Sequence, residues 1–87
     1  MLLAPLATRP VLAEVTAILR EVLDDPAVEL TEDSTAADVP GWDSMAHIAL
    51  VVEAECRFAI TFQAAEIEGL HRVGDLVRLI AAKRGAG

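Results

Sequence analysis

The fold is decided by residues 43–58, which read DSMAHIALVVEAECRF. Asp43 is a residue type that favours the N-terminal cap of a helix, where its carboxylate can accept a hydrogen bond from the backbone of Ala46. The apolar residues that follow recur at helical spacing. We therefore expect a helix that starts at Asp43 or Ser44 and runs to about Arg57.

This helix is expected to carry apolar residues on two opposite sides when residues are placed at steps of 100°. One stripe holds His47, Leu50, Val51, Ala54 and Phe58, and the other holds Met45, Ile48, Ala49, Val52 and Cys56. A domain of 87 residues cannot easily bury both stripes. We expect the stripe with Leu50 and Phe58 to face the core and the other to be partly exposed as a protein-contact surface. The alternative is a helix at the centre of the bundle, buried all round.

Before this helix, the sequence predicts one helix and a long loop. Thr8-Arg9-Pro10 is a start signal, and the helix should end near Leu23, before Asp24-Asp25-Pro26. Its apolar positions are Val11, Val15, Ile18, Leu19 and Val22. Residues 26–41 read as a loop that is longer than most connections in compact domains.

After this helix, the sequence predicts a connector and two more helices. Residues 58–62 alternate in polarity, but with no second strand to pair with they should form an extended connector whose apolar residues fill the core. A short helix is expected from Ala64 to Leu70, closed near Gly69. The last helix is marked by Val73, Leu76, Val77 and Ile80.

Length and composition point to a small helical domain. The chain has 87 residues and a mass of 9.2 kDa, with sixteen alanines and eleven leucines against three aromatic residues. This composition favours helices over sheet. The predicted fold class is all-α, a four-helix bundle of three longer helices and one short helix, with a long loop between helices one and two. We expect one domain over residues 1–87, with a core at about 9–84 and flexible ends at 1–7 and 85–87.

Acidic residues are concentrated in the middle of the chain. Residues 21–56 hold ten acidic and no basic residues, a charge of −10, whereas the rest holds seven basic and four acidic residues, a charge of +3. An acidic chain lacks the basic footprint that nucleic acid requires. The segment is either a solvated acidic loop or a face that attracts basic partner proteins.

Few residues suggest a membrane, a metal or secretion. The longest apolar run in the middle of the chain, Ile48 to Val52, is five residues, and residues 1–6 do not resemble a secretory signal. The single cysteine, Cys56, excludes an internal disulfide and a cysteine-based zinc site, and its spacing to His47 and His71 fits no zinc pattern. We expect a cytoplasmic monomer with no membrane, nucleic-acid or metal site.

Ser44 is the candidate for covalent chemistry. In the first turn of a helix its hydroxyl lies at the positive end of the helix dipole, where a phosphodiester would be stabilised by about 0.3–1 kcal/mol. His47 follows three residues later, but a small helical chain offers little room for the orienting acid, oxyanion hole and cleft of a serine hydrolase.

Residues 30–80 resemble the acyl carrier protein family. The resemblance rests on the acidic loop, the Asp43-Ser44-Met45 signature, the Phe58-Ala59-Ile60 segment with Phe62, and the run Arg72-Val73-Gly74-Asp75-Leu76-Val77. It implies that Ser44, flanked by Asp43 and Met45, carries 4′-phosphopantetheine, whose thiol holds acyl or aminoacyl cargo as a thioester. It also implies a carrier without enzyme activity that is charged by a phosphopantetheinyl transferase and used by loading, condensing or transferring enzymes.

The sequence departs from the family pattern in ways that bear on partners and cargo. Ala46 and Ala49 stand where many fatty-acid carriers have acidic residues, and Trp42 is frequent in carriers of specialised pathways. A specialised polyketide, fatty acyl or peptide-type pathway is therefore expected. The expected partner-binding residues are Asp38, Trp42, Met45, Ile48, Val52 and Glu53. His47 at the rim and the small Ala54 are expected to line the route of a cargo chain.

A different class of function fits part of the same pattern. An acidic helical docking module could bind a basic partner through Met45, Ile48 and Val52 with no prosthetic group. It explains the charge and the second apolar face, but it gives no reason for a serine at position 44.

Overall fold

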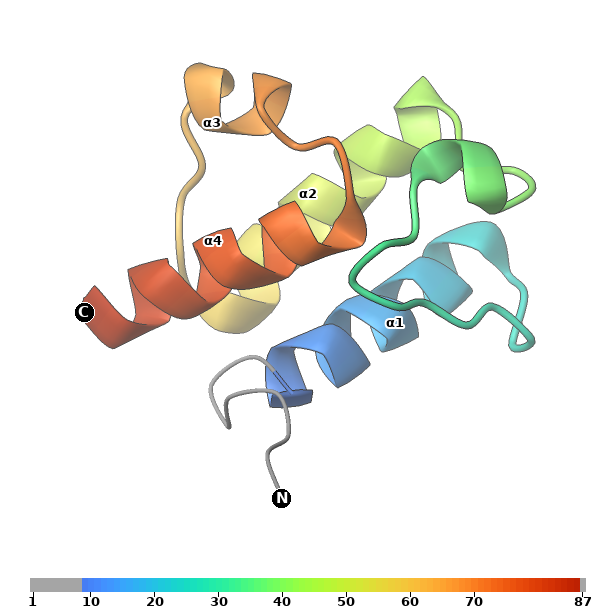
Figure 1. Cartoon of the computed structure of the whole chain (residues 1–87), viewed down its shortest axis with the longest axis horizontal. Coiled ribbons are helices and arrows are strands. Elements are labelled where there is room, and N and C mark those ends of the chain that lie inside the picture. Colours follow the sequence, from blue (N-terminus) through green and yellow to red (C-terminus); the bar gives the residue numbers. More distant parts are fainter. Residues whose placement is uncertain (1–8, 87) are drawn as a thin grey trace.

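The computed structural model describes residues 9–86, which form four α-helices, one 3₁₀ turn and no strand (Figure 1). Along the chain these are α1 (Arg9–Leu23), η1 (Ala36–Asp38), α2 (Ser44–Phe58), α3 (Ala64–Glu68) and α4 (Val73–Ala86). The predicted all-α class, with three longer helices and a short one of five residues, is confirmed.

Two details at the ends of the chain differ from the prediction or lie beyond it. α4 continues through Gly85 and Ala86, which the sequence analysis assigns to a tail. The last turn of a helix tolerates glycine more easily than the interior, because fewer helical hydrogen bonds depend on it. The flexible end expected at residues 1–7 lies outside the described residues.

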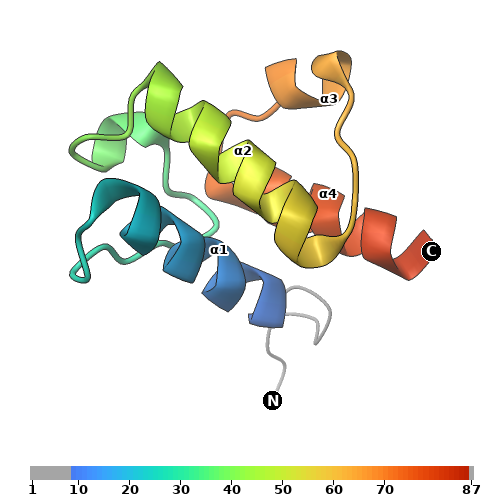
Figure 2. The same cartoon turned by 180° about the vertical axis from the view of Figure 1, so that it is seen from behind.

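The three longer helices pack around one another. α1 contacts both α2 and α4, and it runs in the opposite direction to them (Figures 1 and 2). The short α3 lies on the other side of α2 and α4 from α1 (Figure 1). α2 contacts α1 on one side, and no long helix within residues 9–86 covers its opposite side, where Met45, Ile48 and Val52 are exposed.

The core is built from the apolar residues that the helical spacing selects. Its fully or almost fully buried members are Val11, Val15, Ile18 and Leu19 of α1, Leu50, Val51 and Ala54 of α2, and Val73, Leu76, Val77 and Ile80 of α4. The isolated apolar residues of the long connection, Val28, Leu30 and Val39, and Phe62 of the connector are also buried. Burial of each such aliphatic side chain stabilises the fold by about 1.5–3 kcal/mol before the cost of ordering is subtracted.

Helices α1 and α2 end in the same way. Asp24 (φ 53°) and Ala59 (φ 56°) both adopt left-handed backbone directly after the last helical residue. The following amides bond back into the helix, from Asp25 N to the Arg20 carbonyl at 2.9 Å and from Ile60 N to the Glu55 carbonyl at 3.1 Å. These bonds satisfy carbonyls that a helix end leaves without partners.

The connection between α1 and α2 contains the one element that the sequence did not predict. η1 is held by Asp38, whose carboxylate accepts hydrogen bonds from Thr35 N at 3.0 Å and Thr35 Oγ1 at 3.1 Å. Upstream of η1, the connection is tied to α4 by two backbone bonds, from Val73 N to the Ser34 carbonyl and from Gly74 N to the Glu32 carbonyl, each 2.8 Å long. The long connection is therefore anchored to the start of α4.

Candidate functional site

Ser44 is the first residue of α2, and its side chain is exposed. Asp43 precedes it in extended backbone (φ −105°, ψ −170°) and caps the helix, with Oδ1 accepting a hydrogen bond from Ala46 N at 2.9 Å. The predicted cap and helix start are both confirmed. The local sequence alone thus fixes Ser44 in the first turn.

The electrostatics of this helix start suit an anion. The amides of Ser44 and Met45 have no carbonyl one turn earlier in the helix to bond to, and the first turn contains no acidic residue after the cap. The first backbone hydrogen bond of the helix, from His47 N to the Asp43 carbonyl, is 2.9 Å long. The regular hydrogen-bond pattern of the helix begins with this bond. A phosphate ester on the Ser44 hydroxyl would lie at the positive end of a helix of 15 residues.

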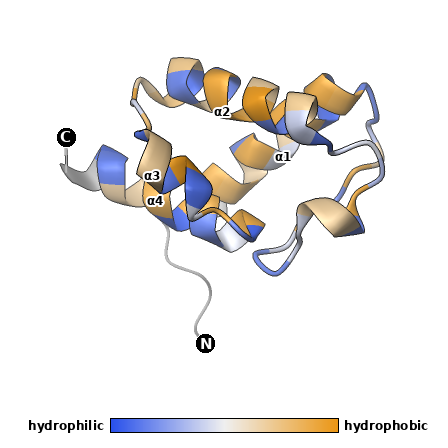
Figure 3. Cartoon of the chain, turned by 90° about the horizontal axis from the view of Figure 1, so that it is seen from above, coloured by the Kyte–Doolittle hydropathy of each residue, from blue (hydrophilic) through white to orange (hydrophobic). Residues whose placement is uncertain are grey.

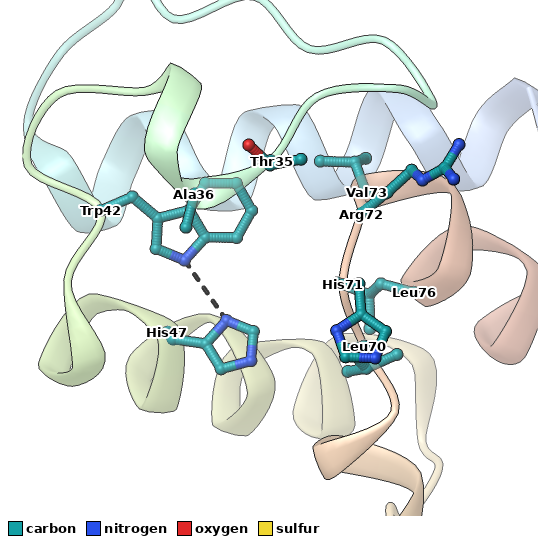
Figure 4. Close-up of a pocket in the computed structure, with 9 residues that line it drawn as sticks. All are labelled: Thr35, Ala36, Trp42, His47, Leu70, His71, Arg72, Val73 and Leu76. Atoms are coloured by element: carbon teal, nitrogen blue, oxygen red, sulfur yellow. Dashed lines mark hydrogen bonds between the residues drawn. The ribbon is translucent and has the colours of Figure 1, made fainter.

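An open groove lies beside Ser44. Its volume is about 480 Å³, and its lining residues are Ala36, Trp42, Asp43, Ser44, His47, Ile48 and Leu70. A smaller cavity of about 40 Å³ lies further inside, lined by Thr35, Ala36, Trp42, His47, Leu70, His71, Arg72, Val73 and Leu76 (Figure 4). The route from Ser44 toward the interior therefore passes between α2, η1 and the segment that joins α3 to α4.

Trp42 and His47 meet where the groove and the inner cavity adjoin. Trp42 Nε1 donates a hydrogen bond to His47 Nδ1 at 3.3 Å, and the two rings are stacked with centroids 6.0 Å apart at 26° (Figure 4). The sequence predicts His47 as a rim residue and Trp42 as a partner-binding residue, but it does not predict their contact. The spacing of five residues between this tryptophan and this histidine, on either side of a helix start, does not by itself predict a contact.

Ala54, the second residue of the expected cargo route, lies deeper in the molecule. Its side chain is fully buried in the core, and it lines neither the groove at Ser44 nor the inner cavity. The sequence did not predict the cavity residues before α2, Thr35 and Ala36, or those that follow α3, Leu70, His71 and Arg72. Nothing in their local sequence marks them, because they meet at the cavity only through the packing of α4 against the connection before α2.

The second apolar stripe of α2 is exposed, as predicted. Met45 is 77% exposed, Ile48 61% and Val52 51%, and Ala49 and Cys56 are exposed as well. Figure 3 shows the apolar colour of α2 continuing onto the side turned away from the other helices. The alternative of a helix that is buried all round is excluded for α2.

The remaining expected partner-binding residues have structural contacts of their own. Asp38 is exposed but accepts a hydrogen bond from the backbone of Thr35, the cap residue of η1, and Glu53 accepts a hydrogen bond from Arg57 Nε at 3.2 Å. Trp42 is half-buried because its indole faces His47. Among the described residues, no helix has both the length and the apolar character needed to cross a bilayer.

Comparison with known proteins identifies the family to which this chain belongs. Residues 13–80 match the family model described as the phosphopantetheine attachment site. The chain is 31% identical over 75 residues to an acyl carrier protein of Thermotoga maritima, covering 86% of this chain and 93% of the relative. It is 35% identical over 75 residues to an acyl carrier protein of Prochlorococcus marinus, covering 86% of this chain and 94% of the relative.

A solved structure gives the same result in three dimensions. The solution NMR structure of holo acyl carrier protein from Geobacter metallireducens superposes with a TM-score of 0.82 at 38% sequence identity, covering 88% of each chain. The family model spans α2 and its flanking elements, and the first residue of α2 offers an accessible hydroxyl at a helix start. The chain belongs to the acyl carrier protein family, and its cofactor is covalently attached 4′-phosphopantetheine.

Proposed function

We propose that Ser44 is the residue that carries 4′-phosphopantetheine and that the chain presents acyl or aminoacyl cargo to partner enzymes. The observation that carries this proposal is the position of Ser44, exposed as the first residue of α2, beside a groove of about 480 Å³ and inside the matched region 13–80. A phosphodiester at this hydroxyl gains from the helix dipole and the two unpaired amides. When bound, the group supplies a thiol that holds cargo as a thioester.

A phosphopantetheinyl transferase would catalyse this attachment. The Ser44 oxygen attacks the phosphorus of coenzyme A next to the pantetheine, and its proton passes to a base of the transferase. A new oxygen–phosphorus bond forms, and adenosine 3′,5′-bisphosphate leaves. The residues of this chain contribute an exposed nucleophile, a helix start fixed by Asp43, and a rigid base from which a long arm can visit several active sites.

The partner surface of this proposal is the exposed stripe of α2. Met45, Ile48 and Val52 project from the helix that begins at Ser44, so an enzyme docked on them would have the arm beside it. The exposed Ala49 adds no negative charge to this surface, which supports a specialised pathway of polyketide, fatty acyl or peptide type, whereas Ala46 is buried and does not belong to the surface. Loading, condensing or transferring enzymes in the cytoplasm are the expected users of the holo form.

The cargo route of this proposal begins at His47. His47 lines both the groove at Ser44 and the inner cavity, so a chain that extends from the groove into the cavity would lie beside it. Ala54 lies two turns further along the same face of α2 and is small, which would let a longer chain extend into the core if neighbouring side chains shift. Ala54 would thus contact the cargo only when the cargo chain is too long to fit within the inner cavity.

The test is a mass measurement. The apo protein is incubated with coenzyme A and a broad-specificity phosphopantetheinyl transferase, and its intact mass should rise by one phosphopantetheinyl group. Ser44→Ala should abolish the gain, whereas Ser34→Ala, on the connection before α2, should leave it intact. An unmodified wild-type protein would contradict the proposal and would leave the acidic docking module as the explanation of the exposed stripe.

A further inference from the structure

Four residues form the boundary between the groove at Ser44 and the inner cavity, since they line both: Ala36, Trp42, His47 and Leu70. Ser44 lies only on the outer side of this boundary, and the buried residues Val73 and Leu76 lie only on the inner side. These four residues therefore lie between the groove at Ser44 and the part of the inner cavity that Val73 and Leu76 line.

Trp42 and His47 close this boundary by contact with each other. Their hydrogen bond of 3.3 Å is long, and a ring separation of 6.0 Å is near the upper end for stacked aromatic rings. The contact is therefore weak enough to part without unfolding the helices. Because His47 Nδ1 accepts, the closed state also requires a neutral imidazole with its proton on Nε2.

The opposite wall of the cavity is fixed. Val73 and Gly74 donate backbone bonds of 2.8 Å to the Ser34 and Glu32 carbonyls, which hold α4 against the connection. A Cβ atom at position 74 would lie 2.9 Å from the Glu32 carbonyl oxygen, so the two backbones are as close as glycine allows. With this wall fixed, the cavity can open to cargo at Trp42 and His47.

We propose that Trp42 and His47 form a gate that sets the shortest acyl chain this carrier shelters. The inference rests on the proposed attachment at Ser44. Parting the gate has a fixed cost, whereas the gain from burying an apolar chain rises with each methylene. Short or polar cargo should therefore stay in the groove, and straight apolar chains above a threshold length should part the two rings and reach Leu76.

The gate has a spectroscopic signature, because Trp42 is the only tryptophan of the chain and gives a single indole N–H signal. The holo protein is prepared with straight acyl chains of increasing length, from acetyl upward, and the indole signal is recorded by NMR. We expect it to stay at the hydrogen-bonded position for the shortest chains and to move upfield once a chain parts the rings. Hydrolysis of the thioester, measured on the same samples, should slow at the same chain length.

His47→Leu removes the acceptor and tests the gate directly. Its holo form should already show the upfield indole signal, and its threshold should fall to shorter chains, whereas His47→Gln, which keeps an acceptor, should move the signal less. Cys56→Ser, at an exposed position on the opposite stripe, is the control and should behave as wild type. Thermal unfolding checks that each variant is folded, and the wild-type series does not depend on any variant.

Two different failures are distinguishable. If the arm attaches but the indole signal is the same at every chain length, or if His47→Leu keeps the wild-type threshold, the gate is refuted and Ser44 remains the carrier residue. If no phosphopantetheine attaches to Ser44, the proposed function is refuted and the gate with it.

Discussion

At the scale of single residues, Ala59 has a backbone conformation that its side chain disfavours. Its left-handed backbone (φ 56°, ψ 48°) costs an L-residue roughly 1–2 kcal/mol, whereas glycine adopts it freely but loses more entropy on folding. Ala59→Gly should therefore raise the free energy of unfolding by about 0.5–1 kcal/mol. The measurement is a urea denaturation curve, in which the midpoint should rise while the slope is unchanged.

The matched control is Ala49→Gly, at an exposed position inside the same helix. At this position the substitution only lowers the helix propensity, and it should lower the free energy of unfolding by about 1 kcal/mol. If both substitutions destabilise to the same extent, Ala59 is not strained.

Arg57 links α2 to α1 through ion pairs that the sequence did not predict. Helical spacing puts it on a flank of α2, but its guanidinium bonds Glu21 at 2.6 Å and Glu14 at 3.1 Å, both on α1, as well as Glu53. These carboxylates, Glu21 first and Glu14 next, raise the pKa of Arg57 well above its usual value. Glu21 and Glu53 of the central acidic segment are thereby paired, and Glu32 and Asp33 form ion pairs with Arg78 and Arg72. Asp38 and Asp43, near the start of α2, are in no ion pair among the described residues.

At the scale of elements, the start of α4 depends on a carboxylate. Asp75 accepts hydrogen bonds from the backbone amides of His71 and Arg72, each 3.0 Å long, and these bonds, helped by Arg78, lower its pKa from the usual 3.8. A lowered folded-state pKa contributes stability that is complete above the unfolded-state pKa and is lost as the pH falls through the folded-state pKa. The free energy of unfolding should thus decrease below about pH 4.

Asp75→Asn separates this effect from the other carboxylates. The variant keeps an acceptor for the two amides but has no charge to titrate, so it should be less stable than wild type at pH 7 and approach wild type as the pH falls. Urea denaturation of both proteins between about pH 2 and pH 7 is the measurement. Parallel stability curves over this range would contradict the role of the charge.

At the scale of the whole molecule, charge and the exposed stripe meet around the start of α2. Asp38 and Asp43 are exposed there, next to the stripe that begins at Met45. If this charge steers basic partners, association with the transferase should slow by roughly tenfold as salt rises from low to molar concentrations, because exposed charges are screened beyond about 8 Å at physiological ionic strength.

The structure decides how this charge must be removed. Asp43 caps α2, and Asp38 accepts hydrogen bonds from Thr35, the cap residue of η1, so lysine at these positions would remove hydrogen bonds as well as charge. Asparagine caps a helix about as well as aspartate at position 43 and keeps an accepting oxygen at position 38, so Asp38→Asn with Asp43→Asn should lower the association rate and its salt dependence while thermal stability changes little. Glu68→Gln, an exposed change on α3 outside the acidic segment, is the control. A rate that neither salt nor the double variant affects would mean that apolar contacts alone recruit the partner.

The helices, the cap at Asp43 and the two faces of α2 follow from the amino-acid sequence alone. These features are local: a capping residue acts within one turn, and helical spacing fixes which side chains share a face. The buried sets of α1 and α4 agree with the spacing for the same reason, because a helix in a small domain has one direction in which to bury its apolar side. The start of α2 at Ser44, and with it the candidate attachment site, is therefore predictable from a few neighbouring residues.

Which distant residues meet depends on the tertiary structure. The link from Arg57 to α1, the bonds from α4 to residues 32 and 34, and the cavity between His47 and Leu76 all join segments far apart in the chain. No periodicity encodes these contacts, because each depends on the angle and offset at which whole helices pack. The contact of Trp42 with His47 is close in sequence but has the same origin, since η1 and the connection before α2 turn the indole inward over the cavity.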